Sequence, residues 1–144
     1  MSQSSTVIRR DFFKELDLFC EVRNLIPTPF NVTGRMGNLK KVSTGTGQLL
    51  FALYVKVKTE NPPFWGINVN QLNSLTSRSG HNWFLVLLLG GGPFYIIPAQ
   101  EVNRTVDSLP FQGDKGEFKL HARDVEPFDR FYDYKSLLAR LPWP

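Results

Sequence analysis

The sequence predicts a single domain of the α/β or α+β class, in which helices flank a mixed sheet of about five strands. Three observations lead to this prediction. The chain has 144 residues, a length that suits one domain. Its residues are 42% hydrophobic and 13% aromatic, which argues against disorder. Helix-type and strand-type hydrophobic patterns alternate along the chain, and this alternation is typical of helices packed on a sheet.

An amphipathic helix is predicted over Asp11–Arg23. Its apolar side chains follow a helical spacing and are Phe12, Phe13, Leu16, Phe19 and Cys20. Residues 1–10 lack this pattern, so we expect a flexible N-terminus. Pro27 and Pro29 end the helix, because proline disfavours helical backbone before it and removes a backbone donor.

A short strand over Phe30–Thr33 and a Gly-rich, basic loop over residues 34–47 are predicted next. The basic residues of the loop are Arg35, Lys40 and Lys41. The loop assignment follows from its glycines and its lack of a sustained apolar pattern.

A strand is predicted over Gln48–Thr59, which is rich in Leu, Phe, Tyr and Val. Its end alternates apolar and basic residues. Side chains alternate across a strand, so Lys56 and Lys58 project from one face and Val55 and Val57 from the other.

The rest of the chain alternates strands and helices of ordinary length, and no linker divides it, so residues 1–144 form one domain. The predicted elements are a strand over Phe64–Val69, a helix over Asn68–Arg78, a strand over Trp83–Leu89, its hairpin partner over Phe94–Ile97, a short turn or helix over Pro98–Val102, an edge strand over Glu117–His121 and a closing helix over Tyr134–Leu141. The run Trp83–Leu89 is continuously apolar, as in a strand buried on both faces.

The positive charge is concentrated in the middle of the chain. The net charge is +4, but residues 22–100 hold seven bases and one acid, Glu60, and so carry +6. A basic block with so few acids attracts polyanions, which makes nucleic acid the first partner to consider.

Several classes of protein and site are excluded by composition. One cysteine and two histidines rule out a disulfide framework and a cysteine-rich zinc site. The N-terminal residues lack the apolar core of a signal peptide, and the longest apolar run is far shorter than the roughly 20 residues that span a bilayer. We therefore expect a cytoplasmic protein with no membrane partner.

Four segments carry a resemblance to a known superfamily. They are Tyr54–Thr59 (YVKVKT), Pro62–Asn68 (PPFWGIN), Trp83–Leu88 (WFLVLL) and Phe94–Pro98 (FYIIP). Together they resemble the PD-(D/E)xK, or restriction-endonuclease-like, superfamily of nucleases, over roughly residues 11–106. The resemblance implies a core of one helix, three strands, a second helix and a further strand. It also implies carboxylates that hold magnesium, with a lysine two residues after the second carboxylate.

The sequence departs from this pattern at the metal ligands. Lys58 matches the motif lysine, but Lys56 stands where the second carboxylate belongs. No Asp or Glu occurs from residue 22 to residue 59, and only Glu15, Asp17 or Glu21 could match a helical glutamate. The prediction is a degenerate member of the superfamily, catalytically impaired and without a cofactor.

Three functions stay open. The first is nucleic-acid binding, DNA or RNA, through Arg35, Lys40, Lys41, Lys56, Lys58 and Trp65. The second is an active magnesium-dependent endonuclease, with Lys58, Glu15 and Glu21 as catalytic residues and Glu60 as a further acid. The third is an interaction or accessory module that binds a protein partner or forms a homodimer, through Phe131, Tyr132 and Trp143.

Overall fold

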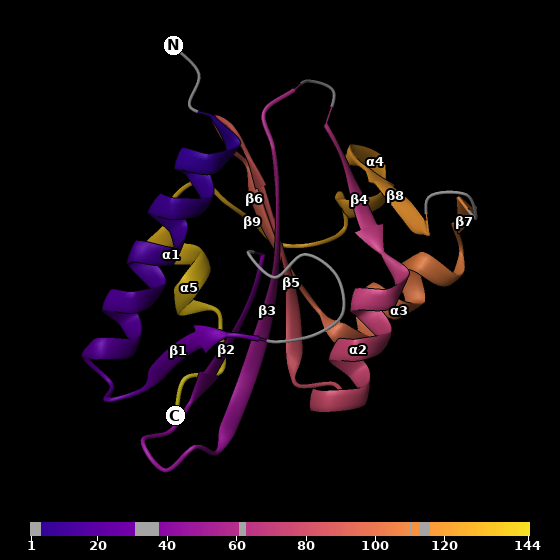
Figure 1. The fold of residues 1–144 in the computed structure, drawn as a ribbon. Coiled ribbons are helices and arrows are strands. Elements are labelled where there is room, and N and C mark those ends of the chain that lie inside the picture. Colours follow the sequence, from indigo (N-terminus) through magenta and orange to yellow (C-terminus); the bar gives the residue numbers. More distant parts are fainter. Residues whose placement is uncertain (1–3, 31–37, 61–62, 110, 113–115) are drawn as a thin grey trace.

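The fold is built on a mixed six-stranded sheet with helices on both faces (Figure 1). The computed structural model describes residues 4–30, 38–60, 63–109, 111–112 and 116–144. In spatial order the strands are β1 (Ile26–Pro29), β2 (Leu39–Ser43), β3 (Leu49–Lys58), β5 (Trp83–Leu89), β6 (Phe94–Pro98) and β9 (Arg130–Phe131). Strands β3 and β5 run parallel, and the other neighbours are antiparallel. The predicted α/β class is confirmed, with six strands in this sheet instead of about five.

Helices α1 (Ser5–Glu21) and α5 (Tyr134–Ala139) lie together against one face, here called the α1 face (Figure 1). Helix α1 buries every fourth side chain of its inner stripe: Ile8, Phe12, Leu16 and Cys20. This spacing places the stripe on one side of the helix. It packs in one apolar cluster with sheet residues that include Phe51, Leu53 and Val55.

The opposite face, here called the α2 face, is covered by α2 (Val69–Ser79), α3 (Ala99–Asp107) and a second sheet (Figure 1). The second sheet has the order β4 (Phe64–Asn68), β8 (Glu117–His121) and β7 (Phe111–Gln112), and α4 (Ala122–Val125) follows β8. The core on this side includes Tyr54, Trp65 and Trp83. Strand β5 contributes alternate side chains to both apolar clusters, as its continuous apolar run predicts.

The expected flexible N-terminus is wrong for residues 5–10, which form the first turns of α1. The helix begins six residues before the predicted Asp11. Ser4 caps it by accepting a hydrogen bond from the Val7 amide at 3.2 Å, and Ile8 extends the buried stripe by one turn.

The predicted loop over residues 34–47 is also wrong in its middle, because β2 occupies Leu39–Ser43. Leu39 and Val42 are buried on opposite faces of the sheet, and the two lysines between them hide the strand pattern. The strand expected over Phe30–Thr33 lies earlier, at Ile26–Pro29; residues 31–37 are outside the described part of the chain. Its prolines are accommodated because β1 is an edge strand.

Strand pairing corrects one further expectation. The strand Glu117–His121 is not an edge strand but the middle strand of the second sheet, between β4 and β7. Strand β4 pairs with β8 and does not join the main sheet. The short element predicted over Pro98–Val102 is the longer helix α3.

The order of elements is the one that the resemblance to the restriction-endonuclease-like superfamily implies. Helix α1 is followed by the antiparallel strands β1, β2 and β3, then by β4 and α2, and then by β5, which pairs parallel to β3. Strand β4 and its sheet are additions to that core. Among the described residues, no helix is long and apolar enough to span a membrane.

The reactivity of the Cys20 thiol tests whether α1 packs against the sheet as described. Its burial, helped by the nearby Asp17 carboxylate, raises the pKa of Cys20 to about 11. Compared with a thiol of pKa 9.0, the reactive thiolate at about pH 8 is about a hundredfold scarcer. We expect iodoacetamide to label Cys20 at least about a hundredfold more slowly in the folded protein than in denaturing urea, as followed by mass spectrometry. Equal labelling rates would contradict this packing of α1.

Candidate nucleic-acid interface

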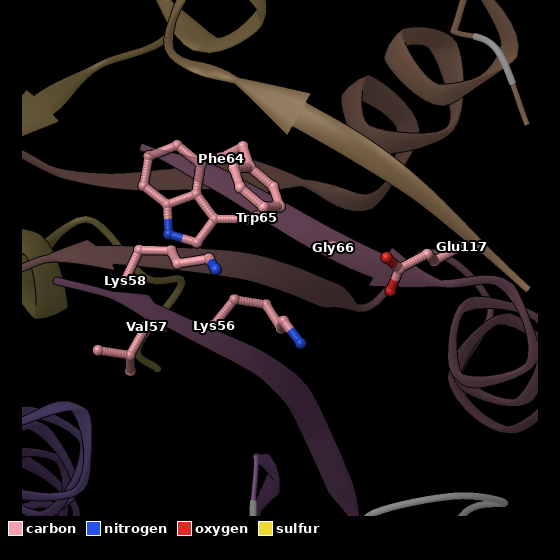
Figure 2. Close-up of a pocket in the computed structure, with 7 residues that line it drawn as sticks. All are labelled: Lys56, Val57, Lys58, Phe64, Trp65, Gly66 and Glu117. Atoms are coloured by element: carbon pink, nitrogen blue, oxygen red, sulfur yellow. The ribbon is translucent and has the colours of Figure 1, made fainter. Parts of the chain in front are cut away.

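A pocket of about 260 Å³ lies between the end of β3 and the second sheet (Figure 2). We call it the lysine pocket. Its lining residues are Lys56, Val57, Lys58, Phe64, Trp65, Gly66 and Glu117. Three strands that are separate in the sequence therefore build it: β3, β4 and β8.

Strand β3 places its two lysines by simple alternation. Tyr54 faces the α2 side core, and Val55 faces the α1 side core. Lys56 and Lys58 continue the Tyr54 row where the core ends, so their stems are half-buried and their ammonium groups reach the pocket (Figure 2). The prediction that these lysines share one face is confirmed.

The ring of Phe64 lies beside two cations. The Lys58 Nζ atom is 4.2 Å from the ring centroid, and the Lys119 Nζ atom is 5.2 Å from it. Both distances are in the range of cation–π attraction. Lys119 comes from β8, where it pairs with Gly66 of β4. Sequence reasoning missed Lys119, because its place depends on the pairing of β4 with β8.

Trp65, one of the predicted nucleic-acid-binding residues, has almost no exposed surface on which a base could stack. It is 1% exposed and packs edge-on to Tyr95, with ring centroids 6.2 Å apart. Within the described residues its Nε1 atom has no hydrogen-bond partner, and Figure 2 shows that nitrogen on the side of the ring that faces Lys58. Phe64, which is half-buried, is the aromatic residue at the opening of the pocket.

Tyr54 comes before Lys56 in the same row of β3 side chains and is fully buried. Its hydroxyl oxygen accepts a hydrogen bond from the Asn68 amide at 3.2 Å, and the Lys56 Nζ atom is 5.9 Å from its ring centroid. Burial raises the pKa of Tyr54 to about 12, so the phenol is neutral near pH 7. The positive charge of the lysine row is therefore not offset by a phenolate.

Two other predicted basic residues, Lys40 and Lys41, do not lie at this pocket. Lys40 lies on the α1 face, where its Nζ atom is 5.2 Å from the Phe13 ring centroid. Lys41 is on the α2 face, 5.9 Å from the Phe30 ring centroid, but it pairs with Ala52, about 13 Å along β3 from Lys56. Arg35 is outside the described part of the chain.

The predicted catalytic glutamates do not meet Lys58. Glu15 lines a groove on the outer side of α1 together with Lys135, and Glu21 is exposed at the end of that helix. The main sheet separates both from the α2 face. Glu60 is exposed beyond the end of β3. The set of Lys58, Glu15 and Glu21 is therefore wrong as a catalytic site.

The donor atoms of the lysine pocket do not suit magnesium. Mg²⁺ prefers several oxygen ligands, but the described lining residues offer one carboxylate, Glu117, against two lysines. In the described part of the chain, no three His, Cys, Asp or Glu side chains come together as a metal site.

Two of the three residues expected to dock a protein partner, Phe131 and Trp143, are partly buried against the core on the α1 face. Trp143 donates its indole N–H to the Leu138 carbonyl at 2.7 Å, and its ring lies 5.3 Å from that of Phe51. Phe131 packs against the α1 side core, whereas Tyr132 is 71% exposed.

The comparisons with known proteins give a likeness of fold. No protein-family model matches the sequence, and no curated protein matches it. The structure of Hjc, a Holliday junction resolvase from the archaeal hyperthermophile Archaeoglobus fulgidus, is similar with a TM-score of 0.48. The two sequences are 12% identical, and the match covers 84% of this chain and 94% of that chain. A likeness at this identity assigns no role to any residue of the lysine pocket.

Proposed function

We propose that this protein is a degenerate restriction-endonuclease-like domain that binds nucleic acid at the lysine pocket and does not cleave it. The observation that carries the proposal is a cluster of cations at one place: Lys56 and Lys58 line the pocket together with Phe64, and the ammonium groups of Lys58 and Lys119 lie beside the Phe64 ring. Cations beside a half-buried aromatic ring suit a nucleic-acid strand, because phosphates bind the ammonium groups and a base can stack on the accessible part of the ring.

Lys58 is the cation best placed to bind a phosphate. In the described part of the chain, no carboxylate lies within ion-pairing distance of its Nζ atom, which lies over the Phe64 ring. A phosphate can therefore bind Lys58 without first breaking an ion pair. The absence of cleavage follows from the donor atoms, since Lys56 occupies the position where the superfamily places a carboxylate.

The proposal predicts binding without hydrolysis. Fluorescence anisotropy with labelled single- and double-stranded DNA and RNA should show binding at about 50 mM salt that weakens steeply by about 200 mM. Supercoiled plasmid incubated with the protein and MgCl₂ should stay intact. Magnesium-dependent cleavage that is lost in Lys58→Ala would instead establish an active endonuclease. Failure of every nucleic acid to bind at low salt would refute the proposal and favour a protein-interaction module.

A further inference from the structure

Gly66 and Glu117 fit together at the edge of the lysine pocket. Glu117 pairs with Asn68 across β4 and β8, so Gly66 is its diagonal neighbour. A methyl group at position 66 would lie 2.6 Å from the Glu117 Oε2 atom and 3.0 Å from its Cδ atom. The carboxylate thus occupies the space that any larger side chain at position 66 would fill.

This arrangement holds a negative charge inside a basic pocket. Figure 2 shows the side chains of Lys56 and Lys58 extending from β3 in the direction of the Glu117 carboxylate. The negative charge of Glu117 also acts on the buried phenol of Tyr54. Burial raises the pKa of Tyr54, and the nearby Glu117 charge raises it further. Among the described residues that line the pocket, Glu117 alone carries a negative charge.

We propose that Glu117 is an internal counterion that, without a direct ion pair to Lys58, weakens the attraction of Lys56 and Lys58 for a phosphate group, and that Gly66 gives its carboxylate room to lie in the pocket. The inference rests on the proposed function and adds a residue that sets its strength. A phosphate entering the pocket meets a like charge, so either binding is weakened or the flexible Glu117 side chain must swing away. The pocket is therefore tuned to hold nucleic acid weakly.

The first test removes the negative charge of Glu117 and keeps the size and shape of its side chain. Glu117→Gln should tighten binding of a labelled single-stranded oligonucleotide at about 50 mM salt on the order of tenfold. Glu21→Gln makes the same change in net charge on the α1 side of the protein, and it should alter affinity by less than about twofold. Equal affinities of the two variants, or weaker binding by Glu117→Gln, would overturn the inference.

The second test displaces the Glu117 carboxylate from its place in the pocket without removing its charge. Gly66→Ala would push the Glu117 carboxylate aside, which is inexpensive because the clashing atoms are the far end of a flexible side chain. We expect Gly66→Ala to tighten binding in the parent protein and to have no effect in the Glu117→Gln background, since the two changes act through one group. Equal effects of Gly66→Ala in the two backgrounds would contradict that coupling.

A third measurement separates this inference from the proposed function. Heparin is a polyanion without bases, so retention on heparin reports the positive potential of the protein without base stacking, and comparing two variants of equal net charge isolates the contribution of the pocket. Glu117→Gln should elute from a heparin column at higher salt than Glu21→Gln. If no nucleic acid binds but the two variants still elute at different salt concentrations, the proposed function is wrong and the counterion role of Glu117 is supported. If nucleic acid binds but the two variants elute together, the counterion role of Glu117 is wrong.

Discussion

Trp65→Ala is expected to lower the free energy of unfolding by about 3–5 kcal/mol, because it leaves a large cavity in the core on the α2 face. Trp65 is 1% exposed, and its indole N–H has no partner in the described part of the chain, so the loss comes from apolar packing. Urea unfolding followed by circular dichroism measures it. Trp65→Phe, which keeps an aromatic ring, is the control and should lower the free energy of unfolding by less than Trp65→Ala.

For Phe64, next to Trp65 in the chain, we expect substitution to affect nucleic-acid binding more than stability. Phe64→Ala removes a half-buried ring, so we expect a stability loss of only about 1–2 kcal/mol. Its larger effect should be on nucleic-acid affinity, because a base that stacks on an aromatic ring gains about 1–3 kcal/mol. Unchanged affinity in Phe64→Ala, or full stability in Trp65→Ala, would contradict the roles assigned to these two residues.

Replacing Lys56 and Lys58 together by alanine is expected to give the largest loss of binding. Each charge-assisted phosphate contact contributes about 1.5–3 kcal/mol, so losing two should weaken binding at least about a hundredfold. The slope of log K against log salt should become shallower by about 1.8 for duplex DNA, or about 1.4 for a single strand. Anisotropy titrations at several salt concentrations measure both quantities.

The control for the lysine pair removes the same charge elsewhere. Lys14 and Lys135 are exposed on α1 and α5, on the opposite side of the main sheet. The double variant Lys14→Ala/Lys135→Ala should keep most of the affinity. If both double variants lose binding equally, the protein binds through its net charge and not through the lysine pocket.

Much of the main sheet could be predicted from local pattern. The continuous apolar run Trp83–Leu89 and its hairpin partner are present as strands β5 and β6, and the alternation that ends β3 correctly places Lys56 and Lys58 on one face. These features depend on short-range geometry alone, since side chains alternate along any strand. Strand β2 was not predicted, because each of its two faces carries one apolar residue and one lysine, so that no alternation of apolar and polar residues is visible.

The content of the pocket could be predicted only in part. Residue counts and strand alternation were enough to predict that the middle of the chain is basic, that its motif lysine lacks partner carboxylates, and that Lys56 and Lys58 share one strand face. It could not decide that Lys40 and Lys41 lie away from that pair, or that Phe64 and not Trp65 is at the opening. Only the tertiary structure brought β8 beside β4, and with it Lys119 and Glu117. Strand pairing joins residues far apart in the chain, and its register is set by the packing of whole sheets and not by any local pattern.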